Sequence, residues 1–105
     1  MSGMLEGKVI LVTGGSTGIG RATSTILAQE GAKVIIADIQ DEEGAKTVGM
    51  VQAVGGQAEY HHVDVSDYAE VSALVSGIAA RHGRLDGAFN NAGIEGPTAK
   101  IFDYS

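Results

Sequence analysis

A glycine-rich segment at residues 13–20 joins a short apolar run to an amphipathic stretch, and this junction constrains the fold more than any other feature. The run at residues 9–12 is rich in β-branched side chains and predicts a buried strand. The stretch after the glycines predicts a helix that ends near Gly31 and has an apolar face of Ile19, Ala22, Ile26 and Leu27. A strand, a tight turn and a helix in this order predict an α/β unit with the helix packed on a sheet.

The same alternation of strand and helix continues along the chain. Residues 34–37 predict a second buried strand that is closed by Asp38. A helix capped by Asp41 follows and fades near Gly55, and a weaker third strand is expected at residues 58–63.

The last predicted helix starts at Asp67, which forms a near capping box with Glu70, and it ends at Gly83. A fourth strand is expected at residues 85–90, and no strong periodicity follows from Ile94 onward. The order β-α-β-α-β-α-β predicts an α/β fold, a Rossmann-type doubly wound parallel sheet with strand order 3-2-1-4. We expect residues 1–105 to form a single domain that is incomplete, because the chain ends without a finished element.

Charge and composition exclude several classes of partner. The chain has a formal net charge of −6 and no block of Lys or Arg, so neither nucleic acid nor an anionic membrane is an expected partner. It has no cysteine, which excludes disulfides and thiolate metal sites. No apolar run is long enough to cross a bilayer, and the charged Glu6 and Lys8 argue against a signal peptide. These features predict a cytoplasmic protein.

The glycine-rich turn is a candidate phosphate site, because the first turn of a helix offers unpaired N–H groups and a positive field. Gly14 permits a tight turn, Gly18 lets the backbone approach a diphosphate, and Gly20 lets the helix pack closely on the strand. Ser16 and Thr17 add hydroxyl donors. A P-loop is excluded because Arg-Ala follows Gly20 where Lys-Ser or Lys-Thr is required, whereas a plain strand-to-helix turn remains the alternative.

Asp38 is the candidate ribose ligand, 18 residues after Gly20 at the end of the second strand. A carboxylate there accepts hydrogen bonds from the ribose hydroxyls and repels a 2′-phosphate, which favours NAD over NADP. The neighbouring positions Thr17 and Ile39 are not basic, although Arg21 remains close enough in sequence to approach a phosphate. The alternative is that Asp38 only ends a strand.

Four motifs in order resemble the short-chain dehydrogenase/reductase family: T-G-x-x-x-G-x-G at residues 13–20, Asp38, Asp64-Val65 and the Asn-Asn-Ala-Gly run at residues 90–93. The resemblance covers residues 5–93 and implies an NAD-binding domain. It implies that Asp64 accepts a hydrogen bond from the adenine amino group and that Val65 packs on the ring. It also implies that the fourth strand ends beside the cofactor, so the expected cofactor-binding residues are Gly14, Ser16, Thr17, Gly18, Ile19, Gly20, Asp38, Ile39, Asp64, Val65, Asn90, Ala92 and Gly93.

The catalytic motif of that family, Tyr-x-x-x-Lys with an upstream Ser, is not found in these 105 residues. Tyr60 is followed four residues later by Asp64, and Tyr68 by Ser72. No catalytic residue is therefore predicted. No metal ligand is predicted either, because His61 and its neighbour in the third strand point to opposite faces of the sheet.

Three functional hypotheses follow. The resemblance implies an NAD-dependent oxidoreductase that transfers a hydride between the cofactor and a carbonyl or alcohol substrate, with this chain as its cofactor half in a homo-oligomeric parent. A non-catalytic or regulatory dinucleotide-binding module is the alternative, and a methyltransferase-like domain is a third with a different glycine loop. On its own the chain is expected to be inactive, and it is expected to be marginal in stability or to associate, since residues 85–90 would form an open sheet edge.

Overall fold

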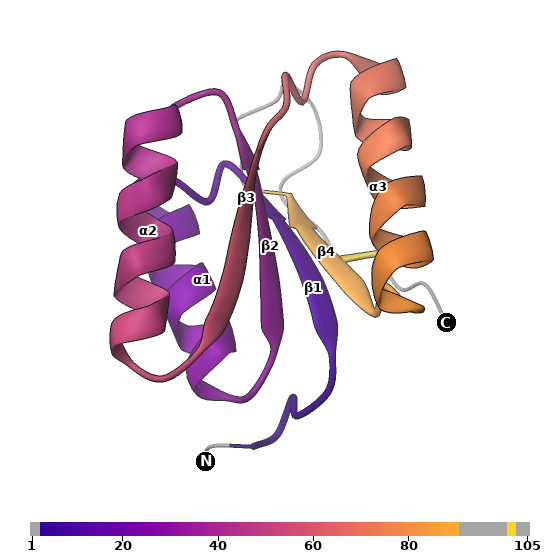
Figure 1. Ribbon diagram of the computed structural model, residues 1–105. Coiled ribbons are helices and arrows are strands. Elements are labelled where there is room, and N and C mark those ends of the chain that lie inside the picture. Colours follow the sequence, from indigo (N-terminus) through magenta and orange to yellow (C-terminus); the bar gives the residue numbers. More distant parts are fainter. Residues whose placement is uncertain (1–2, 91–100, 103–105) are drawn as a thin grey trace.

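The computed structural model describes residues 3–90 and 101–102, and Figure 1 shows a twisted sheet with helices on both faces. Of the predicted site residues, Ala92 and Gly93 lie outside the described part of the chain. The helices are α1 (Gly18–Gln29), α2 (Asp41–Ala53) and α3 (Tyr68–His82). The strands are β1 (Val9–Thr13), β2 (Lys33–Asp38), β3 (Gln57–His62), β4 (Gly87–Asn90) and β5 (Ile101–Phe102).

The sheet has the strand order β3-β2-β1-β4-β5. The first four strands of the chain are mutually parallel, which confirms the predicted order 3-2-1-4 and the Rossmann-type fold. The fifth strand was not expected. It pairs antiparallel with β4 through Ala88 opposite Phe102 and Phe89 opposite Ile101. The prediction that β4 is an open edge is therefore wrong, because β5 covers part of it, and β4 itself begins at Gly87 rather than at Leu85.

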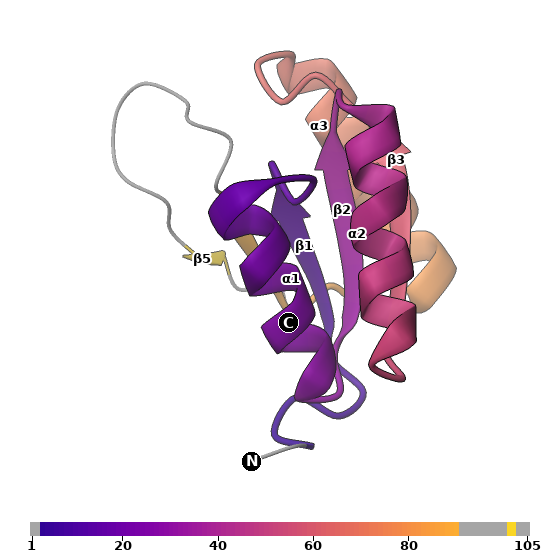
Figure 2. The ribbon, with the colours of Figure 1, turned by 90° about the vertical axis from the view of Figure 1, so that its left-hand side faces the viewer.

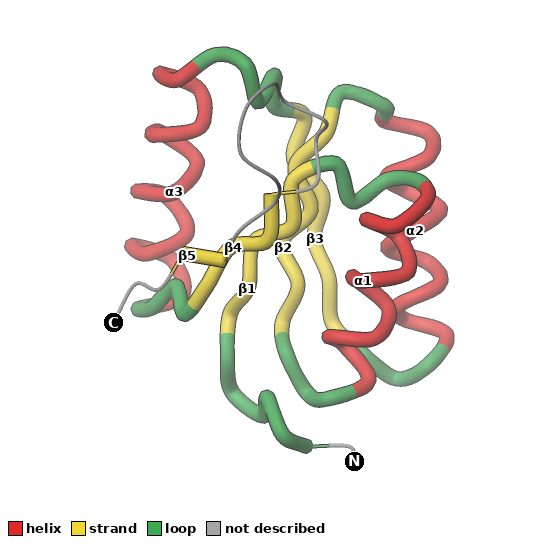
Figure 3. Tube along the Cα trace, turned by 180° about the vertical axis from the view of Figure 1, so that it is seen from behind, coloured by secondary structure: helices red, strands yellow, loops and turns green. Residues whose placement is uncertain are grey.

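Two apolar layers lie on opposite faces of the sheet, and they follow from the alternation of side chains along the strands. Helices α1 and α2 cover one face and α3 covers the other, as the side view and the rear view make clear (Figures 2 and 3). The α3 layer contains Leu11, Ile35, Ala37, Leu74 and Ile78 among its buried residues. The layer under α1 and α2 contains Val12, Val34, Ile36, Ala28 and Val51. Each fully buried Val, Leu or Ile side chain contributes about 1.5–3 kcal/mol relative to an exposed one.

The buried face of α1 differs from the predicted one. Its buried residues are the small ones, Gly20, Ser24 and Ala28, while Ile19 and Ile26 are exposed. Small side chains let the helix approach the sheet closely, so volume rather than hydrophobicity decides which side faces inward. The helix ends as expected, because Gly31 follows it with a φ of +102°.

The predicted N-cap of α2 is wrong, whereas the predicted N-cap of α3 is confirmed. Asp41 does not cap α2: the N-cap position is Gln40, which makes no side-chain capping bond, and the Asp41 carboxylate instead faces β3. Asp67 caps α3 as predicted, because its Oδ1 accepts hydrogen bonds from the backbone N–H groups of Ala69 and Glu70. Glu70 reaches back to the N–H of Asp64 rather than to that of the cap residue.

Within the described ranges, no helix is long and apolar enough to cross a membrane.

Candidate cofactor site

The predicted site residues gather at one edge of the sheet, where the carboxyl ends of the parallel strands meet. There, β1 runs into the glycine turn, β2 ends at Asp38, and β4 ends at Asn90. The stretch after β3 carries Asp64 and Val65 to the same edge. In open α/β sheets this edge is where ligands bind, at the point where the strand order reverses, which here lies between β1 and β4.

Two glycines of the turn adopt a left-handed backbone conformation. Gly14 and Gly18 have φ values of +69° and +57°, which side chains other than glycine rarely tolerate. A Cβ atom on Gly20 would overlap the carbonyl oxygen of Gly14, so the close approach of helix to turn depends on a glycine there. The turn therefore needs glycine for two physical reasons, a positive φ at Gly14 and Gly18 and the lack of space for a Cβ at Gly20.

Neither a capping side chain nor an acidic residue in the first turn offsets the positive N-terminal end of the α1 dipole. Its N-cap residue, Thr17, is extended and makes no side-chain capping bond, and the first turn contains no acidic residue. Backbone N–H groups and the helix dipole at such an end favour a bound anion. This arrangement fits a diphosphate, whose charge would replace the missing cap.

Ser16 lies deeper than its predicted role as a phosphate donor suggests. It is fully buried, its backbone N–H donates to Asp38 Oδ2 at 3.2 Å, and its carbonyl accepts from Thr47 Oγ1 at 3.0 Å. Its hydroxyl is buried without a hydrogen-bond partner in the part of the chain that the structure describes. The backbone of Ser16 thus connects the glycine turn to both β2 and α2.

Asp38 is positioned by two backbone N–H groups. Its Oδ1 accepts from Ile39 at 2.7 Å and its Oδ2 accepts from Ser16 at 3.2 Å, and only 9% of the residue is exposed. Each carboxylate oxygen keeps further lone-pair capacity for another donor. Ile39 follows Asp38 directly and is 58% exposed, and Ile19 in the first turn of α1 is 68% exposed. An exposed apolar group next to a hydrogen-bonded carboxylate is suited to a ligand with a flat ring and hydroxyl groups.

Arg21 is held by α2. Its Nη2 lies 2.9 Å from Glu43 Oε1, and its Nε donates to Thr47 Oγ1 at 2.9 Å. The hydrogen bond from Arg21 is the largest of the effects that lower the pKa of Glu43 below its usual value. To approach a phosphate, this guanidinium would have to break its hydrogen bonds to Glu43 and Thr47.

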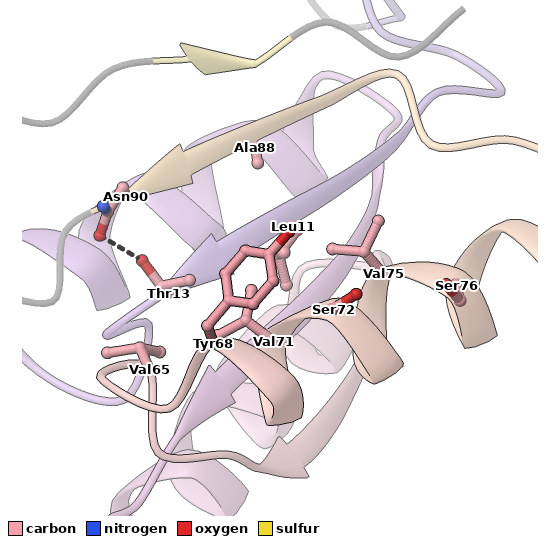
Figure 4. A pocket seen from close by; sticks show the side chains of 10 residues that line it. All are labelled: Leu11, Thr13, Val65, Tyr68, Val71, Ser72, Val75, Ser76, Ala88 and Asn90. Atoms are coloured by element: carbon pink, nitrogen blue, oxygen red, sulfur yellow. Dashed lines mark hydrogen bonds between the residues drawn. The ribbon is translucent and has the colours of Figure 1, made fainter.

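A cavity of about 510 Å³ lies between α3 and the strands β1 and β4 (Figure 4). Two predicted cofactor residues, Val65 and Asn90, line it. Sequence reasoning gave no separate role to Thr13, yet its Oγ1 donates to Asn90 Oδ1 at 2.8 Å and so orients that amide at the end of β4. The signal for Thr13 was its place as the last residue of a strand that meets the glycine turn.

Asp64 stands on the exposed rim of this edge. Its Oδ1 accepts hydrogen bonds from the hydroxyl and the N–H of Ser66, at 2.7 and 3.0 Å. These bonds lower the pKa of Asp64, which therefore stays ionised as an acceptor at neutral pH.

The neighbouring residues His61 and His62 contact different carboxylates. His61 Nε2 lies 2.7 Å from Glu59 Oε2, whereas His62 Nδ1 lies 2.7 Å from Asp41 Oδ1. No group of three or more metal-ligating side chains occurs among the residues that can be described.

Comparison with known proteins places this geometry in a family. The family model described as short chain dehydrogenase matches residues 8–103. The chain belongs to the short-chain dehydrogenase family. The predicted resemblance is thereby confirmed, and so is the assignment to a family of oxidoreductases.

Named relatives are dehydrogenases and reductases. The chain is 50% identical to (+)-borneol dehydrogenase 1 of Salvia officinalis over 98% of this chain and 39% of that protein. It is 46% identical to levodione reductase of Leifsonia aquatica over 85% of this chain and 34% of the relative. This short-chain dehydrogenase chain thus spans less than half the length of these relatives.

Solved structures of the family superimpose well on this one. A putative short-chain dehydrogenase/reductase from Burkholderia xenovorans has a TM-score of 0.84 at 40% identity and covers 91% of this chain and 40% of its own. An NAD⁺-bound xylitol dehydrogenase has a TM-score of 0.81 at 35% identity, over 89% of this chain and 36% of its own. The fold of the cofactor-binding half is therefore that of the family.

Proposed function

We propose that this chain is the cofactor-binding part of an NAD-dependent oxidoreductase that moves a hydride between the nicotinamide cofactor and a carbonyl or secondary alcohol. The observation that carries the proposal is the placement of Asp38, whose carboxylate is bonded to the glycine turn at Ser16. Its charge suits ribose hydroxyls and repels a 2′-phosphate. The NAD⁺-bound neighbour is consistent with the same cofactor.

The residues present fit this cofactor. When bound, the nicotinamide supplies or accepts the hydride. The amides of the turn at residues 14–20 would hold the diphosphate, Asp38 the adenosine ribose, and Ile39 with Val65 the faces of the adenine. Asp64 would accept a hydrogen bond from the adenine amino group, and Asn90, at the end of β4, would lie beside the cofactor.

The wider setting of this activity is part of the same proposal. We expect a small-molecule substrate, a cytoplasmic location and a homo-oligomeric parent, as the family membership suggests. The net charge of −6 supports the absence of nucleic-acid partners.

The replacement Asp38→Ala tests the cofactor assignment. It removes the acceptor for ribose hydroxyls, so NADH affinity should fall by roughly 10- to 100-fold, the range for losing hydrogen bonds to a charged group. NADPH affinity should fall far less, because the repulsion of its 2′-phosphate is also removed. Fluorescence titration of both nucleotides measures the ratio. An equal loss for the two cofactors would refute the ribose role.

Two further variants separate charge from bonding. Asp38→Asn keeps an oxygen acceptor but removes the charge, so it should recover part of the NADPH affinity while it retains some NADH binding. Glu42→Ala makes the same change of net charge at an exposed position in the first turn of α2, and the NADH-to-NADPH ratio should stay at the wild-type value.

The absence of a Tyr-x-x-x-Lys pair from the sequence favours a second candidate, in which these 105 residues bind the dinucleotide without catalysis. Binding of NADH with no NADH oxidation, across a panel of ketones and aldehydes, is the expected result. Measurable turnover by the isolated chain would contradict it.

A further inference from the structure

Three side chains meet beside the turn that carries Asp38. The hydroxyl of Tyr60 lies 2.6 Å from Asp41 Oδ1 and 2.9 Å from the carbonyl oxygen of Asp38. His62 Nδ1 lies 2.7 Å from the same carboxylate oxygen of Asp41. His62 is also the register partner of Asp38 in the parallel pair of β2 and β3. Two donors from β3 thus converge on one oxygen where the chain leaves β2 for α2.

This network adds side-chain bonds to the backbone bonds of the turn, in which Asp38 O accepts from Val63 N at 2.9 Å and Gln40 O accepts from Gly44 N at 2.8 Å. Ile39 and Gln40 are exposed, and the Gln40 side chain makes no capping bond to α2. The Tyr60 ring is fixed in turn, because it packs so closely on Gly44 of α2 that a Cβ there would overlap it. Asp41 therefore anchors the far end of the turn. The near end is anchored by the hydrogen bonds that the Asp38 carboxylate accepts from two backbone N–H groups.

The Asp41 carboxylate of the network is ionised at neutral pH. Burial, then the hydrogen bond to Asp41, raises the pKa of Tyr60, so its hydroxyl remains a donor. The hydrogen bonds from Tyr60 and His62 lower the pKa of Asp41. The bond to Asp41, with smaller effects of Glu70 and Asp64, raises the pKa of His62. An ionised acceptor therefore faces two donors over the physiological range.

We propose that Tyr60, Asp41 and His62 are positioning residues that hold the turn after β2, and thereby the Asp38 carboxylate, in the geometry that prefers NADH to NADPH. The inference rests on the proposed function, because it concerns the same ribose site. Tyr60 contacts the backbone of Asp38, and Tyr60 and His62 both bind Asp41, the residue at which α2 begins. A loosened turn would let Asp38 move away from the ribose hydroxyls and weaken its discrimination against the 2′-phosphate.

The variants Tyr60→Phe and His62→Ala test the proposal in the purified chain. Tyr60→Phe removes only the hydroxyl and keeps the ring against Gly44, so the fold should survive. NADH affinity should fall by roughly three- to tenfold, as the loss of one hydrogen bond allows, with a smaller change for NADPH. His61→Ala is the matched control, since the same change in the neighbouring residue of β3 affects Glu59 instead of Asp41.

A second measurement does not depend on the cofactor. In amide NMR spectra of the nucleotide-free chain, Tyr60→Phe should shift the signals of Ser16 and Ile39, the two N–H groups that bind the Asp38 carboxylate, and His61→Ala should not. Unchanged amide signals in Tyr60→Phe would overturn the proposal, and so would equal losses of NADH and NADPH affinity.

The outcomes separate this inference from the proposed function. If the wild-type chain binds neither nucleotide, the proposed function fails and the inference about selectivity falls with it. If Asp38→Ala changes the NADH-to-NADPH ratio while Tyr60→Phe and His62→Ala do not, the function stands and only the positioning role is wrong.

Discussion

Gly20 shows at the level of one residue how the site depends on volume. Its α-carbon faces the carbonyl of Gly14 so closely that a single methyl group has no space. The family motif indicates a glycine at this position. It does not show that the carbonyl oxygen of Gly14 is the atom that a side chain would overlap. The sequence likewise could not show that Ser16 donates its backbone N–H to Asp38, since that bond joins residues 22 positions apart.

Gly20→Ala should therefore displace the turn. We expect a loss of stability of about 1–3 kcal/mol from overpacking, together with a marked loss of NADH affinity. Urea denaturation and NADH titration provide the two measurements. The matched control is Gly49→Ala in α2, where nothing lies within 4 Å of the new Cβ.

The control should move in the opposite direction. Alanine is favoured over glycine inside a helix by about 0.5–1 kcal/mol, so Gly49→Ala should stabilise the chain and leave NADH binding unchanged. Wild-type stability and affinity in Gly20→Ala would show that the turn has room that its geometry does not suggest.

Elements differed in how well they could be predicted. The strands β1 and β2 were predicted from apolar runs, because a parallel strand buried on both faces has no polar alternation to confuse the signal. By contrast, β3 is an edge strand with polar residues such as Glu59 and His61, and its signal was weak. The two-residue β5 has no sequence pattern of its own, since only its pairing with β4 defines it.

Helix faces and caps were predictable only where local contacts decide them. The cap at Asp67 was predicted because its partners are two and three residues away. Asp41 was misread because its partners, Tyr60 and His62, come from another strand. The exposed Ile19 and Ile26 of α1 were misplaced because a hydrophobic pattern does not record how closely the sheet approaches.

Glu59 links β3 to α3 and should make that junction sensitive to acid. It contacts Arg81 and His82 of α3, and His61 and Lys33 of the sheet. Burial acts to raise the pKa of Glu59, but hydrogen bonds from His61 and Arg81 outweigh it, so the net shift is downward. A lowered carboxyl pKa contributes stability above the unfolded value, near 4.5, and that contribution is lost as pH falls through the folded pKa.

Glu59→Gln should therefore destabilise the chain at pH 7 and have a much smaller effect at pH 3. Urea midpoints of wild type and variant at both pH values give the comparison. Glu42→Gln, an exposed carboxyl in α2, is the control and should have little effect at either pH. A penalty for Glu59→Gln that is independent of pH would show that shape rather than charge links the two elements.

At the scale of the whole molecule, the α3 wall of the cavity leaves apolar side chains partly accessible. Val71 and Val75 are half-buried there, and Tyr68 is 84% exposed. Ile26 and Met4 add exposed apolar area elsewhere. Accessible apolar surface of this kind promotes association in water.

We expect the isolated chain to self-associate or to be marginally stable. Its melting temperature should rise with protein concentration, because mass action favours an associated folded state. Analytical ultracentrifugation beside thermal melts over a hundredfold concentration range would show this. A sharp melt of a monomer at every concentration would contradict the expectation.

The sheet is buried unevenly, and this decides where the chain can vary. Five consecutive residues of β2, from Val34 to Asp38, are buried, whereas no residue of β3 is. In a library of random single substitutions selected for solubility, β2 should accept almost nothing beyond close aliphatic exchanges. In β3, by contrast, the exposed Gln57 lies at the start of the strand, apart from the contacts of Glu59, Tyr60 and His62, so it should tolerate many residue types and is a suitable place to attach a label.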